Sequence, residues 1–240
     1  MQPVKRINLW SGPRNISTAM MYSFAQRNDT VVIDEPLYAH FLNETGLNHP
    51  GREEVLASQE QDGRKVISNV MLGNCDHPIL FFKQMTHHLL NLELDFLSET
   101  FNILLIRDPK QVLISYAKVI TQPSLNDIGI RQSYELDQFL SGRNYHRLII
   151  DASDVVRNPG KMLTAMCENL GIGFQSSMLQ WKAGARPEDG VWAKYWYKNV
   201  HQSTGFTPFE EAAQELSPDL QEIYEQAKPY YDFLSERSLK

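Results

Sequence analysis

Five short apolar runs alternate with helical patterns along the chain, and this alternation constrains the fold more than any other feature. Each run is rich in β-branched or aromatic residues and is bounded by charged or turn residues, as buried strands are. Strands that alternate with helices predict a parallel sheet with helical crossovers, so we expect a three-layer α/β fold. The runs are Ile7–Trp10, Val31–Ile33, Ile79–Phe82, Ile103–Ile106 and Leu148–Ile150.

Helical patterns lie between and after these runs. Ser17–Gln26 is nearly all apolar, which predicts a buried helix. Lys110–Ile120 carries an apolar stripe at helical spacing. Met162–Leu170 is followed by Gly171, a residue favoured directly after a helix. Helical periodicity predicts two further elements, at Glu53–Gln59 and Leu216–Ser238.

The size, charge and cysteine content of the chain narrow its class. Its 240 residues, 42% of them hydrophobic, suit a single domain over residues 1–240. A net charge of −6 argues against a general nucleic-acid binder, yet a local basic pocket is compatible with it. Cys75 and Cys167 form no C-x-x-C pair, so we expect reduced thiols and no metal. Without a signal-peptide pattern or an apolar run of membrane length, we expect a soluble cytoplasmic protein.

The stretch LWSGPRNISTAM, residues 9–20, has the features of an anion-binding loop. The first strand leads through Gly12 into a helix N-terminus, where free N–H groups and the helix dipole attract anions. Ser17 and Thr18 add hydroxyl donors, and Arg14 adds a permanent cation with a forked donor geometry. A plainer interpretation is an ordinary turn whose helix is capped by Ser17, with Arg14 in solvent.

This loop departs from the ATP- and GTP-binding pattern G-x-x-x-x-G-K-[ST]. Gly12 supplies the first glycine. Ser17, Thr18 and Ala19 stand where the second glycine, the lysine and the magnesium-binding hydroxyl belong. Transfer from a nucleoside triphosphate uses a metal to neutralise its charge. A sulfuryl group carries a single negative charge, so the loop favours a less charged donor and no metal.

A second anion-binding pattern lies in FNILLIRDPKQVLISYAK, residues 101–118. The apolar strand ends at Arg107, and Asp108 and Pro109 are favoured at the N-cap and first position of the following helix. Ser115 lies opposite the apolar stripe of that helix. Arg107 and Ser115 are thus expected to converge on one anion at the carboxyl edge of the sheet. Alternatively, Arg107 pairs with a carboxylate and Ser115 lies at the surface.

The two patterns together resemble those of the sulfotransferases that use 3′-phosphoadenosine 5′-phosphosulfate. The resemblance implies a P-loop-type, sulfotransferase-like sheet flanked by helices. It also implies that the first loop holds the 5′-phosphosulfate and that Arg107 and Ser115 hold the 3′-phosphate. The loop residues that would bind the donor are Gly12, Pro13, Arg14, Asn15, Ile16, Ser17 and Thr18.

The chain departs from the usual family pattern at two loop positions. Ile16 replaces a glycine, and Ala19 stands where many relatives carry a tryptophan that packs on adenine. The sequence is similar instead to a bacterial sulfotransferase-like subgroup, whose members can carry misleading aminotransferase names.

Sulfuryl transfer needs a general base near the acceptor and a cation on the leaving phosphate, a role that suits Arg14. His87, in ILFFKQMTHHLL, lies where relatives carry K-T-H, and Glu35, in VVIDEPLY, lies where many bacterial relatives carry E-P. Either is a candidate base, with His88 a weaker one. The resemblance implies that Lys83 helps bind the sulfuryl oxygens. Structural roles, as helix cap or packed histidine, are the alternatives.

The stretch DGVWAKYWYK lies in a long aromatic segment, residues 184–208, and is faintly similar to a late family segment that covers the nucleotide, G-x-x-G-D-W-K. Gly190 and Trp192 match this pattern, Val191 replaces its aspartate and Lys194 is displaced by one position. We expect Trp192 and Lys194 to contact the donor. A packed aromatic flap without ligand contacts is the alternative.

The expected function is sulfuryl transfer from 3′-phosphoadenosine 5′-phosphosulfate to a small-molecule acceptor, with neither nucleic acid nor membrane as partner. Two alternatives remain: a protein that binds adenosine 3′,5′-bisphosphate without catalysis, and an Mg²⁺-dependent small-molecule kinase. The missing lysine and metal hydroxyl weigh against the kinase.

Overall fold

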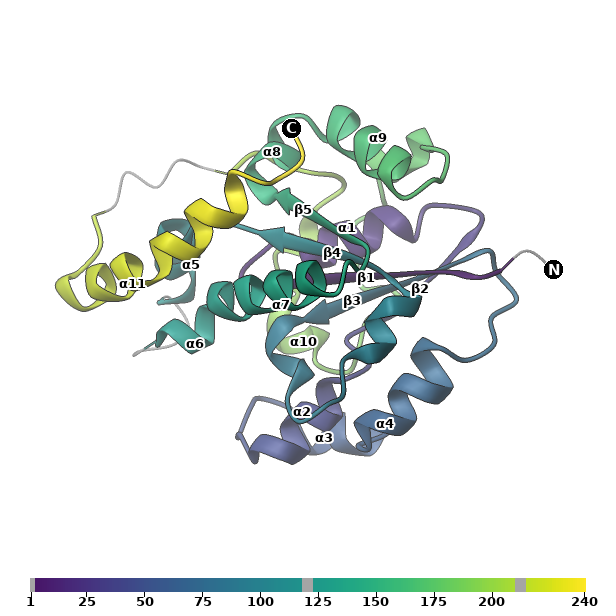
Figure 1. Cartoon of the computed structure of the whole chain (residues 1–240), viewed down its shortest axis with the longest axis horizontal. Helices are drawn as coiled ribbons and strands as arrows, with labels where there is room; N and C mark the ends of the chain where they lie inside the picture. Colours follow the sequence, from purple (N-terminus) through teal and green to yellow (C-terminus); the bar gives the residue numbers. More distant parts are fainter. Residues whose placement is uncertain (1–2, 118–122, 210–214) are drawn as a thin grey trace.

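The computed structural model describes residues 3–117, 123–209 and 215–240. At its centre lies a five-stranded sheet in the order β2-β3-β1-β4-β5, with every neighbouring pair parallel (Figure 1). The expected parallel α/β sheet is therefore confirmed. The strands are β1 (Lys5–Ser11), β2 (Thr30–Asp34), β3 (Ile79–Met85), β4 (Phe101–Ile106) and β5 (Arg147–Asp151).

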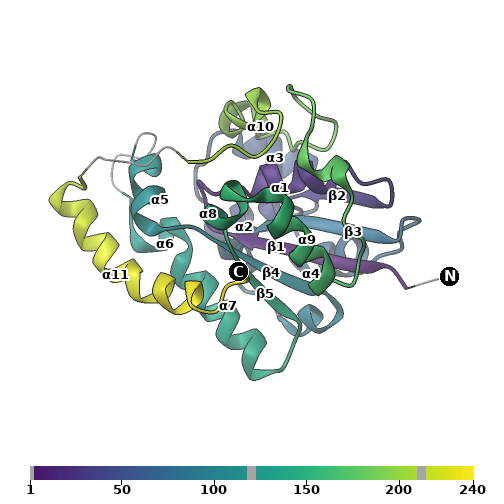
Figure 2. The same ribbon diagram turned by 90° about the horizontal axis from the view of Figure 1, so that it is seen from above.

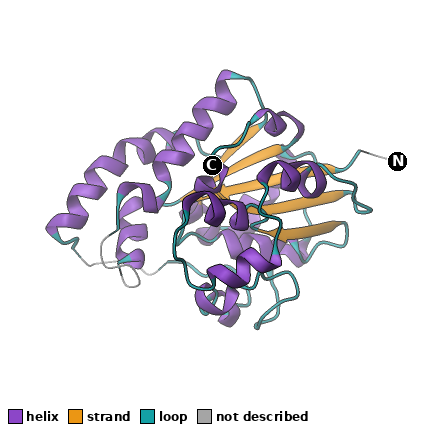
Figure 3. Cartoon of the chain, turned by 90° about the horizontal axis from the view of Figure 1, so that it is seen from below, coloured by secondary structure: helices purple, strands orange, loops and turns teal. Residues whose placement is uncertain are grey.

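Helices cover both faces of the sheet, which gives the three expected layers (Figure 2, Figure 3). Because successive strand side chains point to opposite faces, Leu9 belongs to one core cluster and Trp10 to the other. The first cluster is shared with α1 (Ser17–Phe24), α8 (Ala152–Arg157) and α9 (Pro159–Asn169). The second is shared with α5 (Pro109–Tyr116), α7 (Ile130–Gly142) and α11 (Pro218–Ser235).

The remaining helical elements lie mainly in the loops around the sheet. The α-helices are α2 (Tyr38–Thr45), α3 (Arg52–Ser58), α4 (Gly63–Val66), α6 (Leu125–Ile128) and α10 (Ala193–Trp196). The shorter 3₁₀ and π turns are η1 (Ile67–Met71), η2 (Thr86–Leu89), η3 (Asp95–Glu99), η4 (Ser176–Leu179) and η5 (Val200–Gln202).

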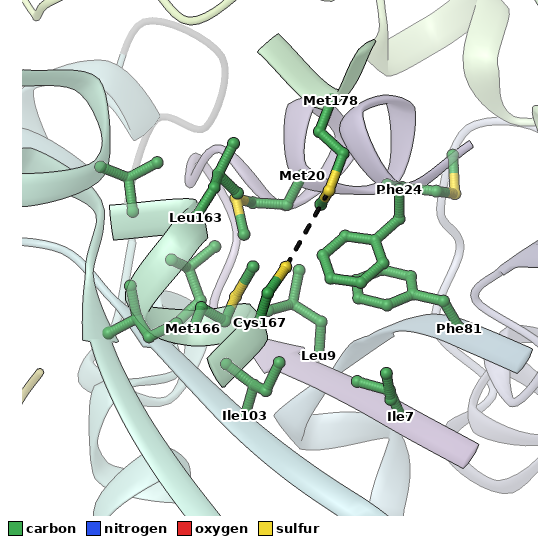
Figure 4. Close-up of a cluster of buried hydrophobic side chains, with 14 of the residues drawn as sticks. Ile7, Leu9, Met20, Phe24, Phe81, Ile103, Leu163, Met166, Cys167 and Met178 are labelled. Carbon is green, nitrogen blue, oxygen red and sulfur yellow. Dashed lines mark hydrogen bonds between the residues drawn. The ribbon is translucent and has the colours of Figure 1, made fainter. Parts of the chain in front are cut away.

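The first core cluster is closely packed (Figure 4). Phe24 of α1 stacks on Phe81 of β3, with ring centroids 4.0 Å apart, a contact that fixes α1 against the sheet. Cys167 of α9 is buried in the same cluster, 4.0 Å from the sulfur of Met178. Both Cys75 and Cys167 are free thiols.

Element boundaries differ from the sequence-based expectations mainly where a charged residue stands inside a strand. The third apolar run ends at Phe82, but β3 continues through Lys83 to Met85 because carboxylates neutralise the buried ammonium. Asp108 and Pro109 occupy the predicted N-cap and first position of α5. The predicted end of that helix, residues 118–120, lies outside the described residues.

Two glycines allow the loop after β1 to lie directly against the α6–α7 junction. A Cβ on Gly12 would come within 2.3 Å of the carbonyl oxygen of Ile128. Gly129 adopts a left-handed conformation with φ of 73°, and a Cβ there would come within 2.8 Å of the Cα of Gly12. The backbones of the two segments therefore touch without an intervening side chain.

We expect Gly12→Ala to lower the free energy of unfolding by about 1–3 kcal/mol, because its methyl group would overlap backbone atoms that cannot easily move. Urea denaturation followed by circular dichroism measures this change. Gly142→Ala is the matched control. A Cβ there meets nothing within 4 Å, so stability should stay equal or rise slightly. Equal stabilities for Gly12→Ala and the wild-type protein would contradict this close packing.

Candidate functional site

A cavity of about 1170 Å³ lies at the carboxyl edge of the parallel sheet. Its wall is formed by the loop after β1, the residues after β2, the end of β3 and Arg107 after β4. Residues 184–208, which we call the flap, form much of the remaining wall. The carboxyl edge is where parallel α/β sheets bind ligands, because their βα loops converge there.

Arg14, Ser115 and Arg107 meet in this cavity. Arg14 Nε donates a hydrogen bond to the hydroxyl of Ser115 at 3.0 Å, and Arg107 Nη1 donates to the carbonyl oxygen of Arg14 at 2.6 Å. Arg14 itself has a left-handed backbone with φ of 55°. The two predicted anion-binding patterns, far apart in sequence, thus form one continuous structure.

The two guanidinium groups create a site with unneutralised positive charge. Within the described ranges, neither Arg14 nor Arg107 forms an ion pair with a carboxylate. Burial, followed by the positive charge of Arg14, lowers the pKa of Arg107 to about 10. Burial likewise lowers the pKa of Arg14. Two half-buried cations side by side are an unfavourable arrangement that a bound anion would relieve.

The first turn of α1 adds backbone donors to this cationic end. The N-cap is Ile16 and makes no side-chain capping bond, so Ser17 does not cap the helix as the plainer interpretation required. Asn15 holds the loop in place instead, since its side-chain amide donates to the carbonyl of Leu105 at 2.9 Å and its oxygen accepts from Ile16 N at 2.8 Å. The helix N-terminus therefore faces the cavity beside Arg14.

Lys83 is buried at the opposite end of the cavity, where all three of its N–H donors have partners. It contacts Glu35 and donates to Asp34 Oδ1 at 3.1 Å and to the Tyr197 hydroxyl at 2.6 Å. The flanking carboxylates outweigh the effect of burial and raise the pKa of Lys83. The expectation that Lys83 binds sulfuryl oxygens is therefore revised: its ammonium has no donor left for a ligand.

Glu35 presents one carboxylate oxygen to Lys83 and the other toward the cavity wall near His88. Its Oε2 lies 3.9 Å from His88 Nε2, beyond hydrogen-bond distance. The backbone of Glu35 is left-handed, with φ of 38°, a strained conformation often found at functional sites. Burial, followed by the negative charge of Asp34, raises the pKa of Glu35 in spite of Lys83.

The two adjacent histidines are both neutral. Burial lowers the pKa of His87 to about 4, and burial lowers the pKa of His88 well below its usual value, with the charge of Lys83 acting in the same direction on His88. The His88 ring stacks on Tyr38 with centroids 5.0 Å apart. In the part of the chain that is described, Nδ1 of both histidines is buried without a hydrogen-bond partner.

The flap places Trp192 in the cavity wall but Lys194 outside it. Trp192 is 2% exposed, and its indole N–H donates to the Tyr197 hydroxyl at 3.2 Å. Lys194 instead pairs with Glu54 at 2.6 Å on the exterior. The expected contact between Lys194 and the donor is thus corrected, because a surface carboxylate holds its ammonium away from the cavity.

Sequence reasoning missed most of the aromatic residues of the cavity wall, three of which have informative positions. Tyr197 bonds to Lys83, Phe206 lines the wall, and Phe209 lies with its ring centroid 3.8 Å from the guanidinium carbon of Arg107. The aromatic richness of residues 184–208 was the available signal, but it did not indicate which residues the aromatic side chains contact.

Over residues 3–117, 123–209 and 215–240, no group of three or more metal-ligating side chains is found. Within those same ranges, no helix is both long and apolar enough to cross a membrane.

A comparison with protein families matches residues 5–238 to the sulfotransferase domain. Two curated Arabidopsis thaliana relatives, the branched-chain-amino-acid aminotransferase-like proteins 1 and 2, are 40% and 39% identical over 229 residues, or 95% of this chain. The chain spans only 41% of the length of either relative. The aminotransferase-like name therefore describes longer proteins, and more than half of each lies outside the region that matches this chain.

Solved structures show the same fold at low sequence identity. The sulfotransferase domain from the curacin biosynthetic pathway has a TM-score of 0.55 at 15% identity, covering 95% of this chain and 99% of that domain. A mouse sulfotransferase solved in complex with PAP has a TM-score of 0.55 at 11% identity, covering 97% of this chain and 89% of that structure. The sulfotransferase-like fold is thereby confirmed.

The neutral His87 predicts a loss of stability in acid. Its pKa is about 4 in the folded protein and about 6.5 when unfolded. Below about pH 6.5 the unfolded chain binds a proton that the folded chain does not, so stability falls as the pH approaches 4. Since His87 is partly exposed at the cavity, we expect about 1–3 kcal/mol from it.

Urea denaturation at several pH values between 7 and 4.5 measures this dependence. His87→Gln should flatten the decline in unfolding free energy, whereas His77→Gln, at an exposed position, should leave it as in the wild-type protein. Parallel curves for His87→Gln and the wild-type protein would show that His87 is not held neutral by burial.

Proposed function

The chain belongs to the sulfotransferase domain family, and we propose that it transfers a sulfuryl group from 3′-phosphoadenosine 5′-phosphosulfate to a hydroxyl or amine of a small acceptor. The observation that carries this proposal is the meeting of Arg14, Ser115 and Arg107 at the N-terminus of α1. Two cations, a helix N-terminus and a hydroxyl in one cavity suit a ligand with two separate anionic groups.

The donor would occupy the cationic end of the cavity. The first turn of α1 and the terminal nitrogens of Arg14 face the 5′-phosphosulfate, and Arg107 with the Ser115 hydroxyl faces the 3′-phosphate. Ser115 accepts from Arg14 and keeps its own hydroxyl proton for a phosphate oxygen. Phe206 and Phe209 provide aromatic surface for the adenine where Ala19 offers none. A complex of a relative of this fold with PAP, adenosine 3′,5′-bisphosphate, supports this type of donor.

In the proposed reaction, the acceptor oxygen or nitrogen attacks the sulfur atom and forms a new bond to it. The bond between sulfur and the bridging phosphate oxygen breaks, and its electron pair stays on that oxygen. Arg14 and the α1 backbone N–H groups stabilise the charge that develops there. The acceptor proton passes to a carboxylate at the other end of the cavity. Fixed cations perform the task that a metal performs in phosphoryl transfer.

Glu35 is the proposed general base in preference to His87. A base works best when its pKa lies near the operating pH. Burial raises the pKa of Glu35 toward that range but lowers the pKa of His87 to about 4, away from it. Glu35 also has a carboxylate oxygen that is not bonded to Lys83. Lys83 then acts on the carboxylate and not on the sulfuryl group.

Replacing each arginine should separate donor binding from transfer. Arg107→Ala should weaken binding of adenosine 3′,5′-bisphosphate by about 10- to 100-fold in calorimetry, since a charge-assisted contact is lost. Arg14→Ala should reduce kcat by about 10²–10³-fold, with a smaller effect on that affinity. Transfer of labelled sulfate from the donor to a panel of hydroxyl and amine acceptors measures kcat.

Arg157→Ala provides the control, because Arg157 is an exposed residue of α8, and it should change neither quantity. The reverse pattern for Arg14 and Arg107 would contradict the assigned roles. Thermal stabilisation by ATP–Mg²⁺ that equals or exceeds stabilisation by the bisphosphate would favour a kinase. Bisphosphate binding without transfer to any acceptor would favour a binding protein.

Substitution of the two candidate bases should distinguish them. Glu35→Gln should reduce kcat by about 10²–10⁴-fold, the usual contribution of a general base, with bisphosphate affinity preserved. His87→Gln should stay within about tenfold of the wild-type kcat. A larger loss in His87→Gln than in Glu35→Gln, measured with the same acceptor, would assign the proton to His87 instead.

A further inference from the structure

Glu35 is held in place by hydrogen bonds to its backbone and by Lys83, which in turn contacts the flap. Its backbone N–H donates to the carbonyl of Lys83 at 2.8 Å, and its own carbonyl accepts from Gln59 Nε2 at 3.1 Å. These bonds keep the left-handed backbone that directs the side chain to the cavity. The carboxylate, however, depends on Lys83, and Lys83 is shared.

Lys83 lies between two carboxylates and one hydroxyl. It contacts Glu35, donates to Asp34 Oδ1 at 3.1 Å, and donates to Tyr197 at 2.6 Å. Two carboxylates compete for this one buried ammonium. A second hydrogen-bond donor to Asp34 would weaken the attraction of Asp34 for Lys83, so that the ammonium interacts more strongly with Glu35.

The flap provides two such donors to Asp34. The Tyr197 hydroxyl donates to Asp34 Oδ2 at 2.7 Å and accepts from the Trp192 indole at 3.2 Å. The backbone N–H of Gly190 donates to the same Asp34 oxygen at 3.1 Å. Tyr197 is 5% exposed, so water does not compete for these bonds. A single buried hydroxyl thus connects the flap, Asp34 and Lys83.

We propose that Tyr197 is a positioning residue for Glu35: its hydroxyl, fixed by the flap between Asp34 and Lys83, sets how the lysine ammonium is divided between the two carboxylates. The inference rests on the proposed role of Glu35 as the base. With Tyr197 in place, Asp34 needs less of Lys83, and Glu35 stays ionised with one oxygen free for the acceptor proton. Without the hydroxyl, Lys83 moves toward Asp34, and Glu35 binds a proton more readily.

The other groups that face Glu35 leave this balance undisturbed. His88 is neutral and its Nε2 lies 3.9 Å from Glu35. Tyr38 stays protonated, because burial and the charge of Glu35 raise its pKa, and its hydroxyl is bonded to His49 at 2.9 Å. Among the residues that the structure describes, Asp34, Lys83 and Tyr197 are the other titratable groups that act on Glu35. The pH at which Glu35 binds a proton therefore depends on how Asp34, Lys83 and Tyr197 are arranged around it.

The test is a carbon-13 NMR titration of the glutamate carboxyl groups in the full chain, with the Glu35 signal assigned by its absence in Glu35→Gln. Tyr197→Phe should raise the midpoint of the Glu35 titration by about 0.5–1 pH unit. Tyr195→Phe is the control, because Tyr195 bonds to Glu54 on the exterior, and the midpoint should not move. An unchanged midpoint in a folded Tyr197→Phe protein overturns the proposal.

If Tyr197→Phe does not fold, 3-fluorotyrosine at position 197 decides the question. It keeps the shape of tyrosine and donates a stronger hydrogen bond to Asp34, so the Glu35 midpoint should fall, and a midpoint that stays or rises contradicts the inference. The titration needs no turnover, so it remains decisive even if the protein transfers no sulfate. Where transfer is observed, the acid limb of the kcat profile should move with the midpoint, with KM for the donor within twofold.

Discussion

The parallel pairing of β1 with β3 on one side and β4 on the other is the constraint on which the rest of the structure depends. Ser11, the last residue of β1, is in register with Met85 and with Leu105. Adjacent strands are about 4.8 Å apart, so the segments that follow these three strands leave the sheet side by side. The meeting of Arg14 with Arg107, and the place of Lys83 in the wall of the same cavity, follow from this register.

The cavity separates its charges into two ends. At one end, Arg14 and Arg107 are bonded to a hydroxyl and a carbonyl, which leaves their positive charge for a ligand. At the other, Lys83 is matched by two carboxylates and belongs to the protein itself. Among the described residues, a positive charge in the cavity wall is therefore left without a carboxylate at one end and is neutralised at the other. The presence of an opposing carboxylate is what distinguishes the two ends.

The same difference explains which parts of the site could be predicted from the sequence. The strand ends and the turns after them could be predicted from local patterns, and the parallel sheet then implied that Arg107 and Arg14 lie at one edge. The partners of the lysines could not be predicted. Lys194 meets Glu54, 140 residues away, and Lys83 meets Tyr197, 114 residues away. Such pairings depend on how long segments pack, which no local spacing encodes.

The contact between Gly12 and Gly129 limits how such a chain can diversify. Thr86 bridges the same place, since its hydroxyl lies 3.4 Å from the carbonyls of Ser11 and Gly129. The loop after β1 and the start of α7 thus meet backbone to backbone, and the Thr86 side chain joins the segment after β3 to both. The shape of the cavity can therefore change through side chains of α7 that line it, such as Gln132 and Glu135, whereas any side chain at Gly12 would force the two backbones apart.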